Sequence, residues 1–213
     1  MSRLAVGASM AMALPCAFPA PAATIEARAV DAAGQPVADA AIWAIPSAPV
    51  PEPRGRTAAI EQVDREFVPQ VTVLQAGTVA SFPNRDPILH HVYSFSSAKS
   101  FEIKLYTGKS PQEVVFDKPG IVTLGCNIHD WMLGYVVVVP TPYFGKTDAS
   151  GVARLRDLPA GTYELRAWHP LQRAALPAQP LALEAATAAP ARFAFDVQAR
   201  KPRYKPPLDR LKY

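Results

Sequence analysis

One short segment of the chain gathers side chains that bind metal ions. Cys126, His129 and Met132 follow one another every three residues in the run CNIHDWM, which places a thiolate, an imidazole and a thioether in one loop. A second imidazole, His90, stands well upstream at the start of another predicted strand. Two histidines and a cysteine in a trigonal arrangement, with a distant axial methionine, are the ligand set of a blue-copper electron-transfer site. The pattern therefore predicts that His90, Cys126, His129 and Met132 hold one copper ion.

Each of these residues also has an ordinary interpretation. A lone cysteine is commonly an inert buried residue, a methionine commonly fills a core, and a loop histidine is commonly satisfied by hydrogen bonds. If the chain had no metal site, these ordinary interpretations would have to hold at all four positions together. Zinc is a further alternative, because one cysteine and two histidines could bind it, but the methionine would then have no role. A cysteine-ligated iron–sulfur cluster needs more thiolates than the chain offers.

The N-terminus is typical of an export signal. Arg3 precedes an apolar stretch over residues 4–18, and Ala20-Pro21-Ala22 offers a small-residue cleavage pattern. We expect residues 1–22 to be removed and the mature protein to be periplasmic; an uncleaved anchor and a lipoprotein at Cys16 are the alternatives. Cys126 is then the single cysteine, and in an oxidising compartment an unpaired thiol must be buried or occupied.

Composition restricts the function class. The chain has 213 residues and a formal charge of +4 from 22 basic and 18 acidic residues, which is too mild to predict nucleic-acid binding. Beyond the N-terminus no apolar run is long enough to span a bilayer, so no membrane span is expected in the mature chain. No Ser/His/Asp set or phosphate-cradling glycine loop favours catalysis, and we expect a protein that is not an enzyme.

The pattern of strands and turns predicts an all-β fold. With 23 prolines against 11 glycines, short strands with proline-marked turns are favoured over a helical bundle. The β-branched run Tyr135–Val139 is typical of a strand buried on both faces. Residues 174–190 are Ala- and Pro-rich, and no strand is predicted there. Burying two-faced strands favours a sandwich.

From residue 57 to 140 the sequence resembles the cupredoxin, or type 1 blue copper, family, and its ligand loop is similar to that of the amicyanin branch. The resemblance is carried by Cys126-x-x-His129-x-x-Met132, by Gly134 with the valine run after it, and by the Asn84 loop before His90. It implies a Greek-key β-sandwich over residues 55–140. The phrases HHVYSFS and LGCNIHDWM are also similar to cupredoxin-type proteins labelled methylamine utilisation proteins, which implies a partner in amine oxidation.

Residues beside the predicted ligands are candidates for supporting roles. The family commonly has asparagine after the upstream ligand, where this chain has His91; strand alternation turns His90 toward the pocket and His91 to the opposite face. We expect His91 either to replace the asparagine brace by hydrogen bonding or to titrate at the surface. Asn127 is expected to direct a backbone amide toward the sulfur. Trp131 is expected to rim an exposed edge of His129, where electrons enter, with core packing as the alternative.

The two flanks resemble parts of one small domain. Residues 24–50 and 141–200 are similar to the opening and the end of transthyretin-like or carboxypeptidase-regulatory-like β-sandwich modules. Because neither flank has enough strands for a core, we expect one split, Ig-like sandwich with the cupredoxin domain inserted in a loop. The alternative is that the N-terminal strands extend the cupredoxin sheet. Residues 201–213 are expected to form a basic tail.

These observations together predict a periplasmic type 1 copper protein that carries single electrons between redox protein partners, whose identity the sequence leaves open. Two other functions stay open. One is a copper-binding or storage module without an electron-transfer partner. The other is a non-metal sandwich that binds carbohydrate or protein.

Overall fold

The computed structural model describes residues 22–50 and 55–199, which form strands joined by turns, loops and bridges. No helix occurs within these two ranges, so the all-β prediction is confirmed for them. Accordingly, none of the described residues lies in a helix long and apolar enough to cross a membrane. Apart from Ala22, the predicted signal over residues 1–22 lies outside the described residues, and so does the predicted tail over residues 201–213.

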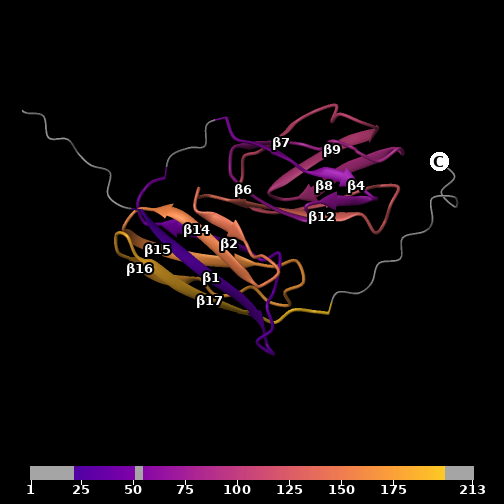
Figure 1. Ribbon diagram of the computed structural model, residues 1–213. Coiled ribbons are helices and arrows are strands. Elements are labelled where there is room, and N and C mark those ends of the chain that lie inside the picture. Colours follow the sequence, from indigo (N-terminus) through magenta and orange to yellow (C-terminus); the bar gives the residue numbers. More distant parts are fainter. Residues whose placement is uncertain (1–21, 51–54, 200–213) are drawn as a thin grey trace, which may run out of the picture.

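Strands from both ends of the chain share two sheets. β1 (Ala23–Asp31) lies between β14 (Val152–Leu158), which is antiparallel to it, and β17 (Ala188–Phe195), which is parallel. The second sheet has the order β13 (Phe144–Lys146), β2 (Ala41–Pro46), β15 (Gly161–Trp168) and β16 (Gln179–Leu183). In Figure 1 the indigo strands from the start of the chain accordingly lie among the orange and yellow strands from its end.

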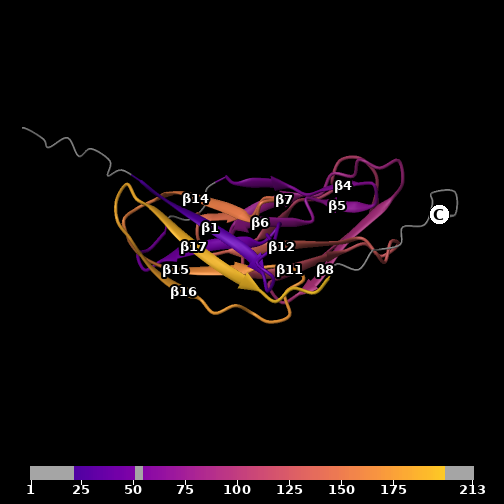
Figure 2. The ribbon, with the colours of Figure 1, turned by 60° about the horizontal axis from the view of Figure 1, so that its bottom comes forward.

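The middle of the chain forms the remaining sheets. A five-stranded sheet has the order β6 (Val71–Gln75), β12 (Leu133–Val139), β11 (Gly120–Gly125), β8 (His90–Ser96) and β9 (Lys99–Tyr106). A smaller sheet has the order β10 (Val114–Phe116), β7 (Thr78–Ser81) and β3 (Thr57–Ala59). β4 (Glu61–Val63) and β5 (Glu66–Val68) form a hairpin. Figure 2 shows β4, β5 and β8 toward the end of the molecule opposite β15 and β16.

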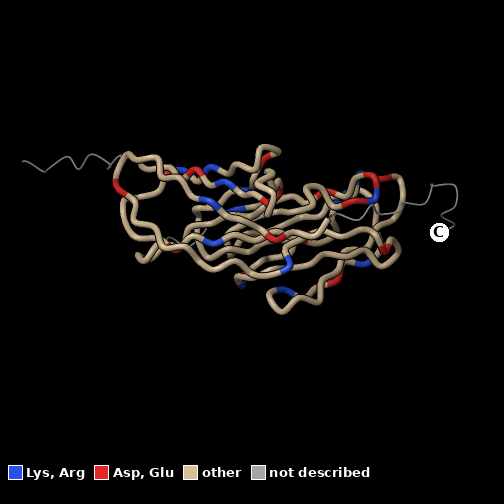
Figure 3. Tube along the Cα trace, turned by 90° about the horizontal axis from the view of Figure 1, so that it is seen from below, with Lys and Arg blue, Asp and Glu red and all other residues tan. Residues whose placement is uncertain are grey.

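Two separate apolar cores match this division of strands. One core belongs to the middle segment and includes Phe67, Phe82, Phe116 and Leu124 together with Cys126 and Met132. The other joins side chains from both flanks, among them Ile25, Ile42, Leu155, Phe193 and Phe195. Figure 3 shows acidic and basic residues interspersed along the trace.

β12 is the strand on which the two groups of sheets meet. Val136 and Val138 point into the core of the middle segment, while Val137 and Val139 lie in a third cluster with Ala41 of β2. Trp43, Phe144 and Trp168 pack against that third cluster from the flank sheets. The predicted burial of the valine run on both faces is therefore confirmed, because β12 packs between the core of the middle segment and this third cluster.

One segment departs from the sequence-based expectation. Residues 174–190 were not expected to contain a strand, yet β16 lies there and pairs with β15 from Gly161↔Leu183 to Leu165↔Gln179. Its residues alternate between exposed and less exposed, but as the outermost strand of its sheet it buries only Leu183. An edge strand of this kind carries a weak periodic signal.

Gly134, two residues after Met132, has no room for a side chain. A Cβ there would lie 2.9 Å from Cβ of Phe67 and 3.1 Å from its ring, and Phe67 is itself fully buried. We expect Gly134→Ala to lower the free energy of unfolding by roughly 1–3 kcal/mol, the usual cost of overpacking. Urea denaturation measures it.

Gly145→Ala is the matched control, because its Cβ would meet nothing closer than 3.6 Å. That variant should unfold at an unchanged or slightly higher urea concentration, since alanine restricts the unfolded chain more than glycine does. Equal destabilisation by both substitutions would show that the contact with Phe67 is not what excludes a side chain at Gly134.

Candidate metal centre

A short loop between two paired strands carries three of the four predicted ligands. Gly125, the last residue of β11, pairs with Leu133, the first of β12, so residues 126–132 form a closed loop. Cys126 and Met132 stand at its two ends. Within the loop the backbone N–H of Met132 donates to the carbonyl of His129 at 2.8 Å, which makes a tight turn. The chain thus fixes Cys126, His129 and Met132 by local geometry.

The fourth predicted ligand comes from the neighbouring strand. His90 is the first residue of β8, which pairs with β11 at Tyr93↔Gly125. Its Nδ1 lies 3.1 Å from Nδ1 of His129 and 3.9 Å from Sγ of Cys126. Sγ of Cys126 lies 3.6 Å from Nδ1 of His129. Two ring nitrogens and one sulfur therefore converge on a single point, the arrangement that three ligands of one metal ion require.

The cluster is enclosed by protein. His90 and His129 are 0% exposed, Met132 1% and Cys126 4%. Met132 belongs to the same core cluster as Cys126, packed with Phe82 and Val136. Such an apolar shell keeps water away from a metal ion and so controls its redox properties.

The electrostatics of the cluster favour neutral imidazoles, and burial opposes ionisation of the cysteine thiol. Burial lowers the pKa of His90 and, together with the nearby His90, lowers the pKa of His129 to about 4. Burial raises the pKa of the Cys126 thiol, while backbone N–H groups of His91, Ile128 and His129 pointing at the sulfur act in the opposite direction. Neutral imidazoles and a thiolate are the protonation states that bind metal, and the N–H groups help the anion form.

His91 points away from the cluster. Its Nε2 lies 2.9 Å from Oε1 of Glu102, and its ring lies against that of Tyr93 with 5.6 Å between centroids. Only its backbone N–H reaches the site, donating to Sγ of Cys126 at 3.5 Å. His91 is 6% exposed, so its side chain does not lie at the surface as one of the two alternatives expected. The side chain is instead held by a carboxylate on β9.

The asparagines differ in what they do. Asn84 braces the loop before His90: its Nδ2 donates to the carbonyls of Ile88 and Tyr106 at 2.8 and 2.9 Å, and its Oδ1 accepts from the N–H of Asp86 at 2.9 Å. Asn127 is exposed, and the amides that point to the sulfur belong to the residues named above. The N–H groups of Ile128 and His129, which follow Asn127 in the turn, therefore point at the sulfur, and a role of Asn127 in directing them stays a prediction.

The environment of His129 also corrects an expectation. An exposed edge of this imidazole was expected as the place of electron entry, but His129 is fully buried. The half-buried Trp131 lies against it, with 5.2 Å between ring centroids. Trp131 therefore covers the histidine instead of rimming an open edge, which is closer to the alternative of core packing.

One residue of the site was missed by sequence reasoning. Oδ2 of Asp86 lies 2.7 Å from Nε2 of His90, the ring nitrogen on the side away from the cluster. The signal available in the sequence is a carboxylate four residues before a predicted ligand, inside a proline-containing loop. Spacing alone does not say which way such a loop turns its side chains.

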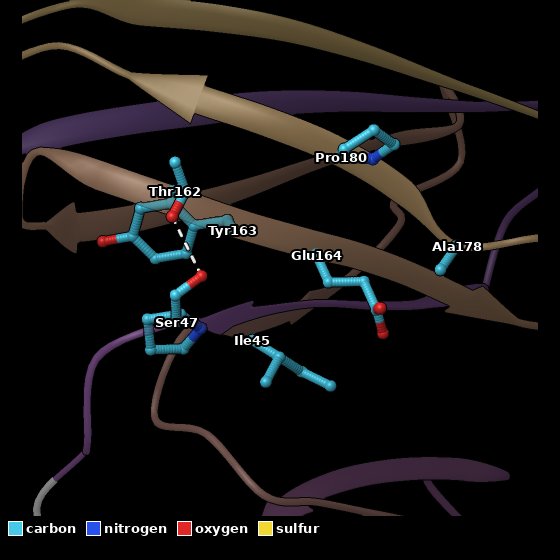
Figure 4. A pocket seen from close by; sticks show the side chains of 8 residues that line it. Ile45, Ser47, Thr162, Tyr163, Glu164, Ala178 and Pro180 are labelled. Carbon is cyan, nitrogen blue, oxygen red and sulfur yellow. Dashed lines mark hydrogen bonds between the residues drawn. The ribbon is translucent and has the colours of Figure 1, made fainter.

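Two hollows elsewhere on the described chain are lined by other kinds of side chain. One of about 440 Å³ lies on the sheet that contains β15, where Thr162 and Ser47 share a hydrogen bond of 2.9 Å beside Tyr163 and Glu164 (Figure 4). A cleft of about 460 Å³ between that sheet and the five-stranded sheet is lined mainly by apolar side chains such as Trp43 and Trp168. Among the described residues, the histidine–cysteine cluster is where metal-binding atoms converge.

No family model matches the chain, and no curated protein matches it significantly. Solved structures show a distant similarity to part of the chain. A purple cupredoxin from Nitrosopumilus maritimus is 21% identical, with a TM-score of 0.34, over 39% of this chain and 99% of that chain. A reduced variant of amicyanin is 16% identical, with a TM-score of 0.37, over 45% of this chain and 98% of that chain.

An enzyme is also among the similar structures. A Cu-containing nitrite reductase from Thermus scotoductus is 24% identical, with a TM-score of 0.37, over 52% of this chain but only 28% of that chain. The likeness to cupredoxins is thus distant and covers about half of the chain. We therefore derive the chemistry of the site from its own geometry.

Proposed function

We propose that this chain is an exported, periplasmic type 1 copper protein that carries single electrons between redox partner proteins and turns over no substrate. One copper ion per chain would be held by His90, Cys126 and His129, with Met132 as the weak axial ligand. The observation that supports this most is the convergence of Sγ of Cys126 and two Nδ1 atoms within a buried pocket.

The donor set fits copper in both of its oxidation states. Thiolate and thioether sulfur are soft ligands that suit Cu(I), and imidazole nitrogen suits copper in either state. Bound copper supplies a one-electron couple. The chain's own contribution is to hold the donors still: Cys126 and Met132 are fixed by paired strands, and three N–H groups point at the sulfur. A zinc site would need no thioether, so the placement of Met132 in this loop favours copper.

The domain organisation belongs to the same proposal. Residues 55–140 form a cupredoxin-type Greek-key sandwich inserted into a split, transthyretin-like or Ig-like sandwich made of residues 24–50 and 141–200. The shared sheets of β1, β2 and β13–β17, with their own core, support this division. The phrases around His91 and Cys126 support a partner in amine oxidation only by resemblance.

The test is to add Cu(II) to the purified protein and record its visible spectrum. We expect an intense charge-transfer band that saturates at one equivalent, disappears on reduction and returns on reoxidation. Cys126→Ser should lose the band, because the serine hydroxyl offers no thiolate. Circular dichroism of the variant without metal shows whether its fold is kept.

Three other results would contradict the proposal. Copper that binds without colour would favour a storage or binding module, and absence of stoichiometric metal would favour a non-metal sandwich. A band that persists in Cys126→Ser would show that the sulfur is not a ligand.

A further inference from the structure

A carboxylate holds the outer nitrogen of one predicted ligand. Oδ2 of Asp86 lies 2.7 Å from Nε2 of His90, while Nδ1 of the same ring faces the sulfur and His129. His90 is fully buried, and the side chain of Asp86 is 10% exposed. A carboxylate that accepts from Nε2–H makes Nδ1 the nitrogen with the free lone pair. The contact therefore sets which ring nitrogen can bind a metal.

The carboxylate is itself held by backbone groups. The N–H of Asp64 donates to Oδ1 of Asp86 at 2.7 Å, and the N–H of Arg65 donates to Oδ2 at 2.8 Å. Asp64 and Arg65 form the turn between β4 and β5. The backbone N–H of Asp86 donates a third hydrogen bond, to Oδ1 of Asn84 at 2.9 Å, so both the side chain and the backbone of Asp86 are held. Asp86 thus meets His90 in one defined geometry.

The turn that holds Asp86 has an unusual backbone. Asp64 and Arg65 have φ of 53° and 59°, in the left-handed region, and neither is glycine. A two-residue hairpin loop such as the one between β4 and β5 favours left-handed values at both of its residues. Here the conformation turns two successive N–H groups toward one carboxylate. This hairpin turn therefore holds the carboxylate that contacts His90 through two backbone N–H groups.

Building on the proposed copper site, we infer that Asp86 is a positioning residue that fixes His90 with Nδ1 toward the metal and strengthens it as a donor. Carboxylates behind ligating histidines fix the tautomer and raise the basicity of the ligand. A more basic imidazole favours Cu(II) over Cu(I), because the harder, more highly charged ion gains more from it. Asp86 therefore lowers the reduction potential of the site.

The test compares two variants that each remove one negative charge near the cluster. Asp86→Asn removes the charge-assisted contact with His90. Asp130→Asn is the matched control, since Asp130 is exposed and acts on His129 only through its charge. We expect Asp86→Asn to keep the visible band but bind Cu(II) 10–100-fold more weakly, the usual effect of losing such a partner. If the affinity for Cu(I) is unchanged, a 10–100-fold loss of Cu(II) affinity raises the reduction potential of the site by about 60–120 mV, at about 59 mV per tenfold. Asp130→Asn should shift it much less.

A second measurement needs neither copper nor a variant. Long-range ¹H–¹⁵N NMR of the metal-free protein should show His90 with the proton on Nε2. Thermal unfolding of the metal-free variants checks that each is folded before its potential is read. If Asp86→Asn does not fold, the NMR result on the unchanged protein still decides the orientation of His90.

The outcomes separate this inference from the proposed function. A coloured protein whose potential is the same with Asp86→Asn as with Asp130→Asn would overturn the role of Asp86 and leave the copper proposal intact. A proton on Nδ1 of His90 would overturn it as well. A colourless parent protein would contradict the copper proposal, and a proton on Nε2 would then still support the positioning of His90 by Asp86.

Discussion

His90→Ala is expected to abolish the coloured copper site, whereas His91→Asn is expected to keep it. His90 places a ring nitrogen 3.1 Å from Nδ1 of His129, and its removal leaves one imidazole, the thiolate and the weak thioether of the proposed set. The ring of His91 lies elsewhere, bonded to Glu102, and only its backbone N–H contacts the sulfur. Asparagine keeps that N–H. Copper titrations followed by visible absorption should show no band for the first variant and a saturating band for the second.

The two variants control for each other, because they remove adjacent buried imidazoles. Loss of the His91–Glu102 pair should cost little stability, since Glu102 is 57% exposed and such pairs contribute about 0–1 kcal/mol. The reverse pattern, a colourless His91→Asn beside an intact His90→Ala, would exchange the two assignments. Loss of colour in both would mean that the contact of His91 with the sulfur is as important as the ring of His90.

The choice of His90 shows what strand periodicity can and cannot decide. Regular alternation predicts that neighbours on a strand face opposite sides. In the structure the pairing of β8 with β9 shifts between His90 and Val92, and His90, His91 and Val92 are all buried. Burial therefore does not alternate here. The two rings are separated by their directions, which an irregular strand fixes and a sequence pattern does not reveal.

The parts of the site that could be predicted are local in sequence. Cys126 and His129 share one short loop, so their spacing nearly fixes their geometry, and the valine run after them predicts a strand buried on both faces. Asp86 could not be placed in the same way, since its position depends on the turn at Asp64 and Arg65, far from it in the chain. The burial of His129 depends likewise on where the neighbouring Trp131 folds.

The same distinction applies to the fold. Short alternating segments predicted an all-β chain, because strand propensity and turn residues are local signals. The parallel pairing of β1 with β17 joins the two ends of the described chain, from Thr24↔Ala188 to Asp31↔Phe195. Strands so far apart in sequence pair because their apolar faces are buried in the same core, and a local sequence pattern does not show this. Only the resemblance of the flanks to one module hinted at it.

Met132→Leu is expected to keep copper and colour and to raise the reduction potential. In the proposed site the cysteine and two histidines would form the strong trigonal set and the axial thioether would be weak, so its loss should leave the ion bound. Soft sulfur can hold Cu(I), but an additional axial donor stabilises the more highly charged Cu(II) more, so loss of the thioether favours Cu(I). A tenfold change in that preference corresponds to about 59 mV. Leucine nearly matches methionine in volume, so this 1%-exposed site should lose less than about 1.5 kcal/mol of stability. Redox titration followed at the charge-transfer band measures the shift.

Leu124→Met is the matched control for repacking. Leu124 is fully buried in the same core, on β11 ahead of the ligand loop, so the exchange of leucine and methionine there perturbs packing in the reverse direction. Its potential should stay close to that of the parent protein. An equal shift in both variants would attribute the change to the apolar shell and not to the thioether. Complete loss of copper in Met132→Leu would show that Met132 is a strong ligand, because a weak axial donor can be removed while the other three still hold the ion.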